Sequence, residues 1–296
     1  MDFVQLRPAV SKALWQKDQT QFMALIHEAL ATASGAEYGR ILTLQANWFL
    51  YAETQNAAQG LVLVQEALPL VRKNPNALLD ALVMALALCF CMGDPERARE
   101  FEDEACSLLL QQGLSDEVRS LRHRLYVNLG HVATLRSDYA TAYWYFVQAA
   151  NNLADPAVKE SERRSFASAV QLDIATACLR VRRYYEALEA LDLAEQATQR
   201  QLVHFHVATW RAELLRQLGR LDEAFELLAK EAATAEACES PRIQARYYWV
   251  AALVAHDLGD VPGFHLLFAK AQEIAATQRL DFLLSEIQRF HVPPGS

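Results

Sequence analysis

Residues 125–155, LYVNLGHVATLRSDYATAYWYFVQAANNLAD, decide the fold of this chain. Apolar residues recur there at the three- and four-residue spacing of an amphipathic helix, on both sides of a short polar turn at Ser137-Asp138. Small and large apolar residues stand at fixed offsets around the turn: Leu129, Gly130, Tyr139, Ala142, Phe146 and Ala149. These features predict two helices that pack closely through their small residues.

The same arrangement recurs along the whole chain. The last small position of each predicted pair falls at Ala29, Ala67, Ala105, Ala149, Ala194, Glu231 and Ala271, between 37 and 45 residues apart. A recurring two-helix unit predicts a repeat protein in which each unit packs on its neighbours. We expect one superhelical domain over residues 1–296, with helix pairs at about 7–35, 37–73, 75–113, 116–154, 156–200, 202–238 and 241–277 and a capping helix at 279–291.

Three residues depart from this pattern. Glu102 stands where an aromatic or aliphatic residue is expected, and we expect Phe101 beside it to cover the gap. Glu231 replaces the last small residue of the sixth pair. Phe264 replaces a small residue in the seventh pair, which predicts a differently packed last interface.

With these motifs the chain resembles the tetratricopeptide repeat (TPR) family. The family motif is matched by Tyr126, Leu129-Gly130, Tyr139, Ala142, Phe146, Ala149 and Pro156. Pro156 stands two positions later than the motif requires. A second match is Ile174-Ala175, Tyr184, Ala187, Leu191 and Ala194. The repeats are longer than the family's usual length of about 34 residues, as in its bacterial regulatory and signalling members. The resemblance implies an all-α fold, a right-handed α-solenoid of about seven antiparallel helix pairs with a C-terminal capping helix.

Composition favours a folded, acidic protein. The chain has 296 residues, a formal net charge of −8 and 52% hydrophobic residues. The negative charge disfavours nucleic acid and anionic membranes as partners. The longest apolar run, residues 81–92, is shorter than the ~18–20 residues of a bilayer span and predicts a buried helix. Five scattered cysteines and the absence of a secretory signal predict a cytoplasmic protein.

The resemblance also implies where a partner binds, because the first helix of each TPR pair lines a concave groove. The groove positions carry over to Arg124, His131, Arg180, His206, Arg216, Arg246, Trp249 and His256. Arginines that face one another across a groove can hold a carboxylate or phosphate in bidentate fashion, and Trp249 offers an anchor for an apolar side chain. These residues predict an acidic or carboxylate-terminated protein or peptide partner. The alternative is that the arginines pair with nearby Asp and Glu residues of the chain itself.

No motif predicts catalysis. HExxH, paired-cysteine, nucleophile-elbow and phosphate-loop patterns are all missing from the sequence, so we expect no enzyme activity, cofactor or metal. Tyr143, Trp144 and Tyr145 raise the question of RNA binding, but core packing in a second helix explains them more simply.

The sequence therefore predicts a non-enzymatic scaffold or regulatory protein of a bacterial-type cytoplasm, which holds a partner segment in its groove. Two alternatives stay open. One is a sensor module of a signalling or transcription-regulatory protein, or a peptide-pheromone receptor. The other is a chaperone for a secreted protein.

Overall fold

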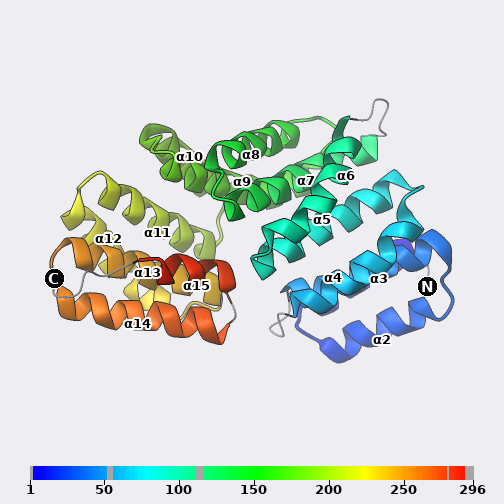
Figure 1. Ribbon diagram of the computed structural model, residues 1–296, viewed down its shortest axis with the longest axis horizontal. Coiled ribbons are helices and arrows are strands. Elements are labelled where there is room, and N and C mark those ends of the chain that lie inside the picture. Colours follow the sequence, from blue (N-terminus) through cyan, green and yellow to red (C-terminus); the bar gives the residue numbers. More distant parts are fainter. Residues whose placement is uncertain (1–2, 52–55, 111–115, 279, 291–296) are drawn as a thin grey trace. The chain divides into compact units, whose positions relative to one another are not determined.

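The computed structural model describes residues 3–51, 56–110, 116–278 and 280–290. These residues form fifteen α-helices and no strand (Figure 1). The expected all-α fold is therefore confirmed. The helices are α1 (Phe3–Trp15), α2 (Gln19–Leu30), α3 (Gly35–Tyr51), α4 (Ala57–Val71), α5 (Pro75–Met92), α6 (Pro95–Leu110), α7 (Asp116–Leu135), α8 (Tyr139–Leu153), α9 (Glu160–Arg180), α10 (Tyr184–Gln196), α11 (Gln201–Gln217), α12 (Leu221–Glu236), α13 (Pro241–Asp257), α14 (Val261–Thr277) and α15 (Asp281–Gln288).

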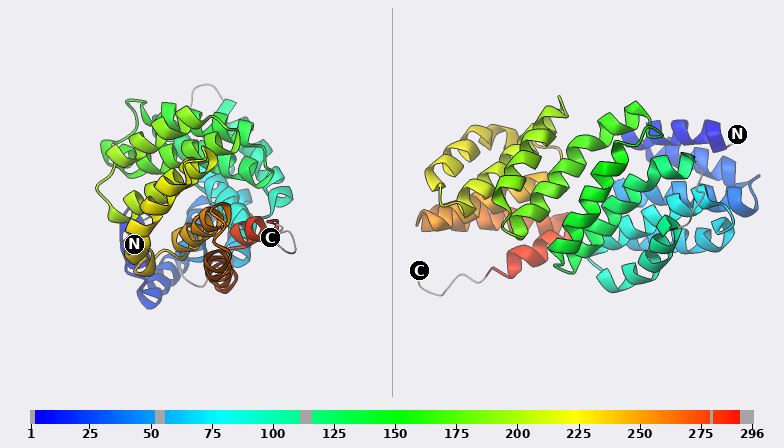
Figure 2. Two further views of the ribbon diagram at one scale, coloured as in Figure 1. Left: turned by 90° about the vertical axis from the view of Figure 1, so that its left-hand side faces the viewer. Right: turned by 90° about the horizontal axis from the view of Figure 1, so that it is seen from above.

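From α1 to α7, and again from α8 to α15, consecutive helices pack against one another (Figure 2). The first helices of successive pairs also pack on one another: α1, α3, α5 and α7 form one series, and α9, α11 and α13 form another. The first helix begins at Phe3 rather than at about residue 7, so Pro8 lies inside it. Its apolar stripe explains the earlier start, because Leu6, Val10 and Ala13 are buried and Phe3 packs on the same core cluster.

Two compact units make up the chain. Unit 1 comprises residues 1–138 and 155–158, and unit 2 comprises residues 139–154 and 159–296. The boundary falls at the turn after α7, so the predicted fourth pair contributes α7 to unit 1 and α8 to unit 2. The single superhelical domain stays a prediction.

The described turns within the pairs share one backbone geometry. Six turns contain a residue with φ between 54° and 79°: Lys17, Gly93, Ser137, Arg182, Gly219 and Gly259. The next residue donates its N–H to the carbonyl five positions earlier, as from Asp94 to Cys89 at 3.1 Å. This is the left-handed ending that closes many helices. Asp94 then caps α6 by accepting from the Arg97 N–H at 3.0 Å. A turn of this kind reverses the chain within a few residues.

The small residues lie at the helix contacts, as expected. Ala29, Ala67, Ala105, Ala149, Ala194 and Ala271 are at most 2% exposed. In the sixth pair Ala235, one helical turn after Glu231, is buried and takes the place of the small residue that Glu231 replaces. Phe101 is buried as expected, and Glu102 beside it pairs with Arg136 at 2.6 Å. Phe264 is 2% exposed, so the large side chain is accommodated inside the last pair.

One described helix, Pro75–Met92, is long and apolar enough to span a membrane by length and composition alone. Two thirds of it, 67%, is buried, because α3, α4, α6 and α7 pack around it. This is the environment of a core helix.

Gly39 lies at a close approach between α3 and α4 in unit 1. A Cβ at this position would lie 2.8 Å from Val71 Cγ1 and 3.1 Å from the Ala67 carbonyl oxygen. We expect Gly39→Ala to lower the free energy of unfolding by about 1–3 kcal/mol, because the added methyl group overpacks the α3–α4 contact. Urea titration of the far-ultraviolet circular dichroism measures the change. If helix propensity alone mattered, alanine would instead stabilise the helix by ~1 kcal/mol, and that result would contradict the packing account.

Candidate functional site

The first helices of unit 2 enclose an open pocket of about 700 Å³. Arg180 comes from α9, Arg216 from α11, and Arg246 and Trp249 from α13. The structure thus brings four of the eight predicted site residues to one place. The remaining side chains of the lining are Trp210, Glu213, Gln217, Val250, Leu253, Glu286, Arg289 and Phe290.

A single carboxylate lies between two of the arginines. Arg246 donates from Nη1 to Glu286 Oε1 and from Nη2 to Oε2, both at 2.9 Å. Arg180 Nη2 donates to the same Oε1. Glu286 belongs to α15, which lies beside α13 and α14 in Figure 1. We call Arg180, Arg246 and Glu286 the carboxylate site.

The electrostatics of the carboxylate site favour ionised Glu286. Burial by itself would raise the pKa of Glu286, but the positive charges of Arg246 and Arg180 and their hydrogen bonds lower it well below its usual range. The bidentate geometry is the arrangement in which a guanidinium group recognises a carboxylate most strongly.

A second ion pair borders the carboxylate site. Arg216 donates to both oxygens of Glu213, at 2.8 and 3.0 Å, and to Asp257 at 2.7 Å. Glu213 is 6% exposed. Burial alone would lower the pKa of Arg216, but the hydrogen bonds to both carboxylates raise it. This arginine therefore stays charged and bound to Glu213 and Asp257.

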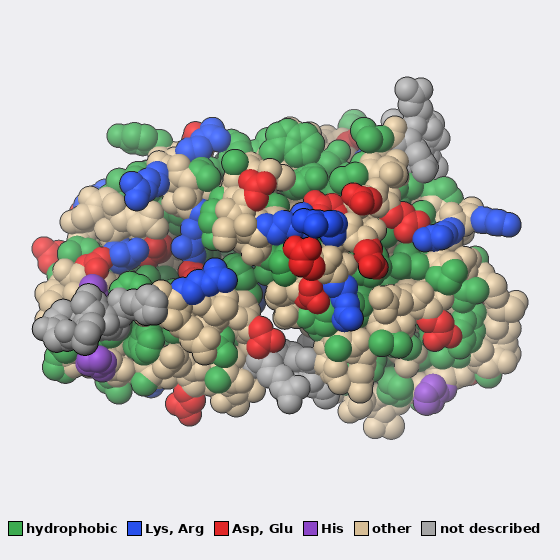
Figure 3. Space-filling view, viewed as in Figure 1, with side chains coloured by type: hydrophobic (Ala, Val, Ile, Leu, Met, Phe, Trp, Pro, Cys, Tyr) green, Lys and Arg blue, Asp and Glu red, His purple; other side chains and the backbone are tan. Residues whose placement is uncertain are grey.

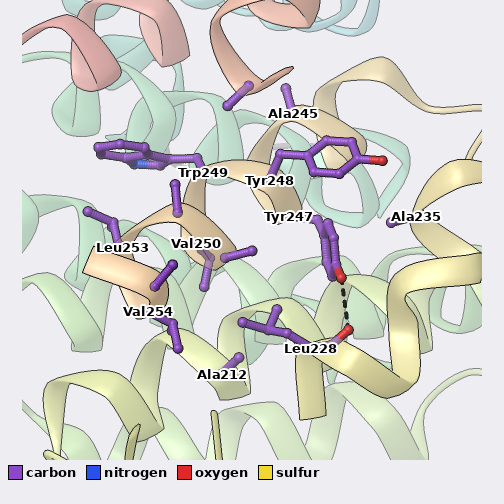
Figure 4. Close-up of a cluster of buried hydrophobic side chains, with 14 of the residues drawn as sticks. Ala212, Leu228, Ala235, Ala245, Tyr247, Tyr248, Trp249, Val250, Leu253 and Val254 are labelled. Atoms are coloured by element: carbon purple, nitrogen blue, oxygen red, sulfur yellow. Dashed lines mark hydrogen bonds between the residues drawn. The ribbon is translucent and has the colours of Figure 1, made fainter. Parts of the chain in front are cut away.

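Trp249 forms the apolar floor of the pocket. It is 3% exposed, and its ring meets Phe268 and Phe290 edge to face, with centroids 5.9 and 5.4 Å apart. Figure 4 shows Trp249, Tyr247 and Tyr248 extending in different directions among alanine and aliphatic side chains. The Tyr247 hydroxyl donates to the Leu228 carbonyl at 2.8 Å. The edge-to-face contact means that the Trp249 indole already packs on Phe290 of the chain itself.

The comparisons with known proteins identify the fold. No protein-family model matches the sequence, and no curated protein matches it either. Solved structures do match. A tetratricopeptide repeat protein from Parabacteroides merdae has a TM-score of 0.58 and 16% identity, with 96% of this chain and 98% of that one covered. The fold of this chain is TPR-like.

Two more solved structures share the TPR-like fold. The apo form of RapI has a TM-score of 0.58 at 12% identity, over 84% of this chain and 70% of that chain. A Rap protein complexed with Competence and Sporulation Factor has a TM-score of 0.57 at 16% identity, over 85% and 71%.

The two groove histidines of unit 2 contact aromatic side chains of the chain itself. His206 Nε2 accepts the Trp210 indole N–H at 3.0 Å. Burial, together with the positive charges of Arg242 and Arg246, lowers the pKa of His206 to about 3, so its ring is neutral at pH 7. His256 lies 3.0 Å from Asp257, and its ring packs on Phe264 and Phe290. In the described parts of the chain, no three His, Cys, Asp or Glu side chains gather as a metal site would require.

The remaining predicted residues, Arg124 and His131, belong to unit 1. Arg124 Nη1 donates to Asp80 Oδ1 at 3.2 Å, and His131 stacks on Phe90 with ring centroids 4.6 Å apart. The predicted set therefore divides between two units. All four predicted arginines also pair with carboxylates of the chain itself, as the alternative interpretation expected. On the face shown in Figure 3, many basic side chains likewise lie beside acidic ones.

Sequence reasoning missed Glu286, the central residue of the carboxylate site. A signal for it exists: Leu283, Glu286, Ile287 and Phe290 follow the spacing of one helical face. Leu283 and Ile287 are buried, so the same face carries Glu286 inward. A lone acidic residue on the apolar stripe of a terminal helix predicts a buried basic partner.

Proposed function

We propose that this TPR-like protein is a non-enzymatic scaffold or regulatory protein that binds a segment of a partner protein in the pocket of unit 2. The observation that carries the proposal is the carboxylate site, where Arg180 and Arg246 already hold one carboxylate in bidentate geometry. An acidic side chain or a C-terminal carboxylate of a partner has the same chemistry as Glu286. The pair is thus preorganised for an acidic ligand.

In this proposal α15 acts as an internal occupant that the partner displaces. The helix has eight residues, and a helix of this length has little stability of its own. It is held by Glu286 and by the burial of Leu283 and Ile287. A partner segment that offers a carboxylate and apolar side chains therefore competes with α15 for the same contacts. The measured binding free energy is the difference between the free energy with which the segment binds the site and that with which α15 binds it.

The similar structures support a partner-binding role. One of them is a Rap protein complexed with Competence and Sporulation Factor, so a fold of this kind accommodates a bound partner. A receptor or sensor function is the second candidate, and the observation that favours it is α15 itself. Displacement of a terminal helix by a partner changes the surface that the chain presents to other molecules. We place the protein in the cytoplasm, where its five cysteines stay reduced.

The test is affinity capture from the native lysate, with mass spectrometry of the bound proteins. We expect Glu286→Gln to increase the yield of the partner, because it removes the competing carboxylate and leaves both arginines. We expect the triple variant Arg180→Gln, Arg246→Gln, Glu286→Gln to lose it, since all three charges are gone and no unpaired charge is left buried.

Arg164→Gln is the matched control, because Arg164 is an exposed arginine of the same unit that pairs with Glu160 at 2.7 Å. Circular dichroism confirms that each variant is folded. A partner captured equally by the wild type and the triple variant would show that the carboxylate site takes no part in binding.

A further inference from the structure

Unit 1 contains an open pocket of its own, also of about 700 Å³, on α1, α3, α5 and α7, the first helices of its pairs. Four charged side chains line it, one from each helix: Arg7, Arg40, Asp80 and Arg124. It takes no residue from unit 2.

The positive charges in this pocket outnumber the negative ones. Arg124 Nη1 lies 3.2 Å from Asp80 Oδ1, and Arg7 Nη1 lies 3.8 Å from Asp80 Oδ2. Both oxygens of the single carboxylate are therefore engaged by two arginines. Asp80 neutralises one positive charge, and three guanidinium groups leave the lining with a net charge of +2.

Arg40 is the third cation, and no described carboxylate pairs with it. Its guanidinium carbon lies 3.8 Å from the centroid of the Phe3 ring, which fixes the plane of the group. Its Nε atom is buried and has no hydrogen-bond partner among the described residues. A buried donor without an acceptor is unfavourable unless a ligand supplies the acceptor.

A purely structural role accounts for only some of the four charged side chains in this pocket. One arginine is enough to pair with Asp80, and a second strengthens the contact between helices. A third, stacked on an aromatic ring and not bonded to the carboxylate, adds repulsion that no described carboxylate offsets. An anion that bridges Arg40 to Arg7 or Arg124 removes this imbalance.

We propose that the pocket of unit 1 binds a small organic dianion that carries either a phosphate group or two carboxylates. A charge of −2 balances the lining, and guanidinium groups donate in parallel to the oxygens of both groups. Asn47 supplies a polar contact for the rest of the ligand, because its amide nitrogen donates to the Thr43 and Leu44 carbonyls at 3.2 and 3.3 Å and its amide oxygen remains as an acceptor. This site is independent of the carboxylate site in unit 2 and of the partner proposed for it.

Isothermal titration calorimetry of the full chain at low ionic strength tests the proposal, with inorganic phosphate and succinate as separate probes. We expect one saturable site for at least one probe. Arg40→Gln should weaken binding at least tenfold, whereas Asp80→Asn should strengthen it, because the net charge of the lining rises. Saturation by phosphate alone assigns a phosphate-bearing ligand, and saturation by succinate alone assigns a dicarboxylate.

Two controls define the site. Arg72→Gln removes an exposed arginine of unit 1 that pairs with Glu104 at 3.2 Å, and it should leave binding unchanged. The triple variant of the carboxylate site should also bind the probe as the wild type does. Arg40→Lys keeps the charge but not the planar donor fork, so it should bind more weakly than the wild type. The proposal is overturned if neither probe saturates the wild type, or if folded Arg40→Gln and Arg40→Lys both bind as tightly as the wild type.

Discussion

Replacing Trp249 by alanine should lower the free energy of unfolding of unit 2 by about 3–5 kcal/mol. The indole is 3% exposed and packs on Phe268 and Phe290. Its removal leaves a cavity beneath the pocket and takes away the surface on which Phe290 rests. Urea titration followed by circular dichroism at 222 nm measures the effect without relying on tryptophan fluorescence.

Trp144→Ala is the matched control, because Trp144 lies in α8 of the same unit and is 53% exposed. We expect its free energy of unfolding to fall by less than about 1 kcal/mol. The comparison separates two roles for Trp249. If Trp249→Ala weakened partner capture while unfolding like the control, Trp249 would be an exposed anchor for the partner and not part of the core.

Replacing Glu286 by glutamine should lower the free energy of unfolding by roughly 2–3 kcal/mol at pH 7. The change leaves Arg180 and Arg246 facing a neutral side chain. Their side chains are 29% and 12% exposed, and that of Glu286 is 21% exposed. Because some water reaches all three groups, the effect should be smaller than for a fully buried ion pair.

The pH dependence gives this prediction a second readout. The folded-state pKa of Glu286 is lowered, so its ionised form contributes stability fully above its unfolded pKa of about 4.3. That contribution is lost as the pH falls through the folded pKa. The difference in stability between the wild type and Glu286→Gln should therefore be constant near neutral pH and should shrink below about pH 4.

Glu223→Gln provides the control for Glu286→Gln. Glu223 pairs with Arg220 at 2.6 Å in the same unit, but their side chains are 55% and 53% exposed. Exposed ion pairs contribute about 0–1 kcal/mol, so this change should be small. Equal effects of the two substitutions at pH 7 would mean that the carboxylate site is no more than a surface ion pair.

Glu286→Gln and Trp249→Ala together separate effects on stability from effects on partner binding. Glu286→Gln should weaken the attachment of α15 while it increases partner capture, because both follow from loss of one internal contact. Trp249→Ala should reduce both, since it damages the floor on which α15 and any replacement for it rest. Opposite signs for the two variants in the capture experiment are therefore a direct consequence of the internal-occupant proposal.

Sequence reasoning was most successful where the signal is local. The alanine positions from Ala29 to Ala271 predicted which side chains lie at helix contacts, because the spacing along a helix fixes which residues share a face. The terminal helix was expected at 279–291 and is found at Asp281–Gln288. The Asp94 cap is also a local feature, since a cap depends on residues within one turn.

Residue types along the chain thus determined the helices and the TPR-like fold, and they placed Arg180, Arg216, Arg246 and Trp249 on the first helices of their pairs. Only the tertiary structure decided which charges meet. Arg180 and Glu286 are 106 positions apart in the sequence, and no periodicity within a helix relates two residues at such a separation. Their contact depends on how α15 packs on unit 2. Burial of the apolar side chains of Leu283 and Ile287 fixes the position of this helix, and Glu286 then lies beside the two arginines.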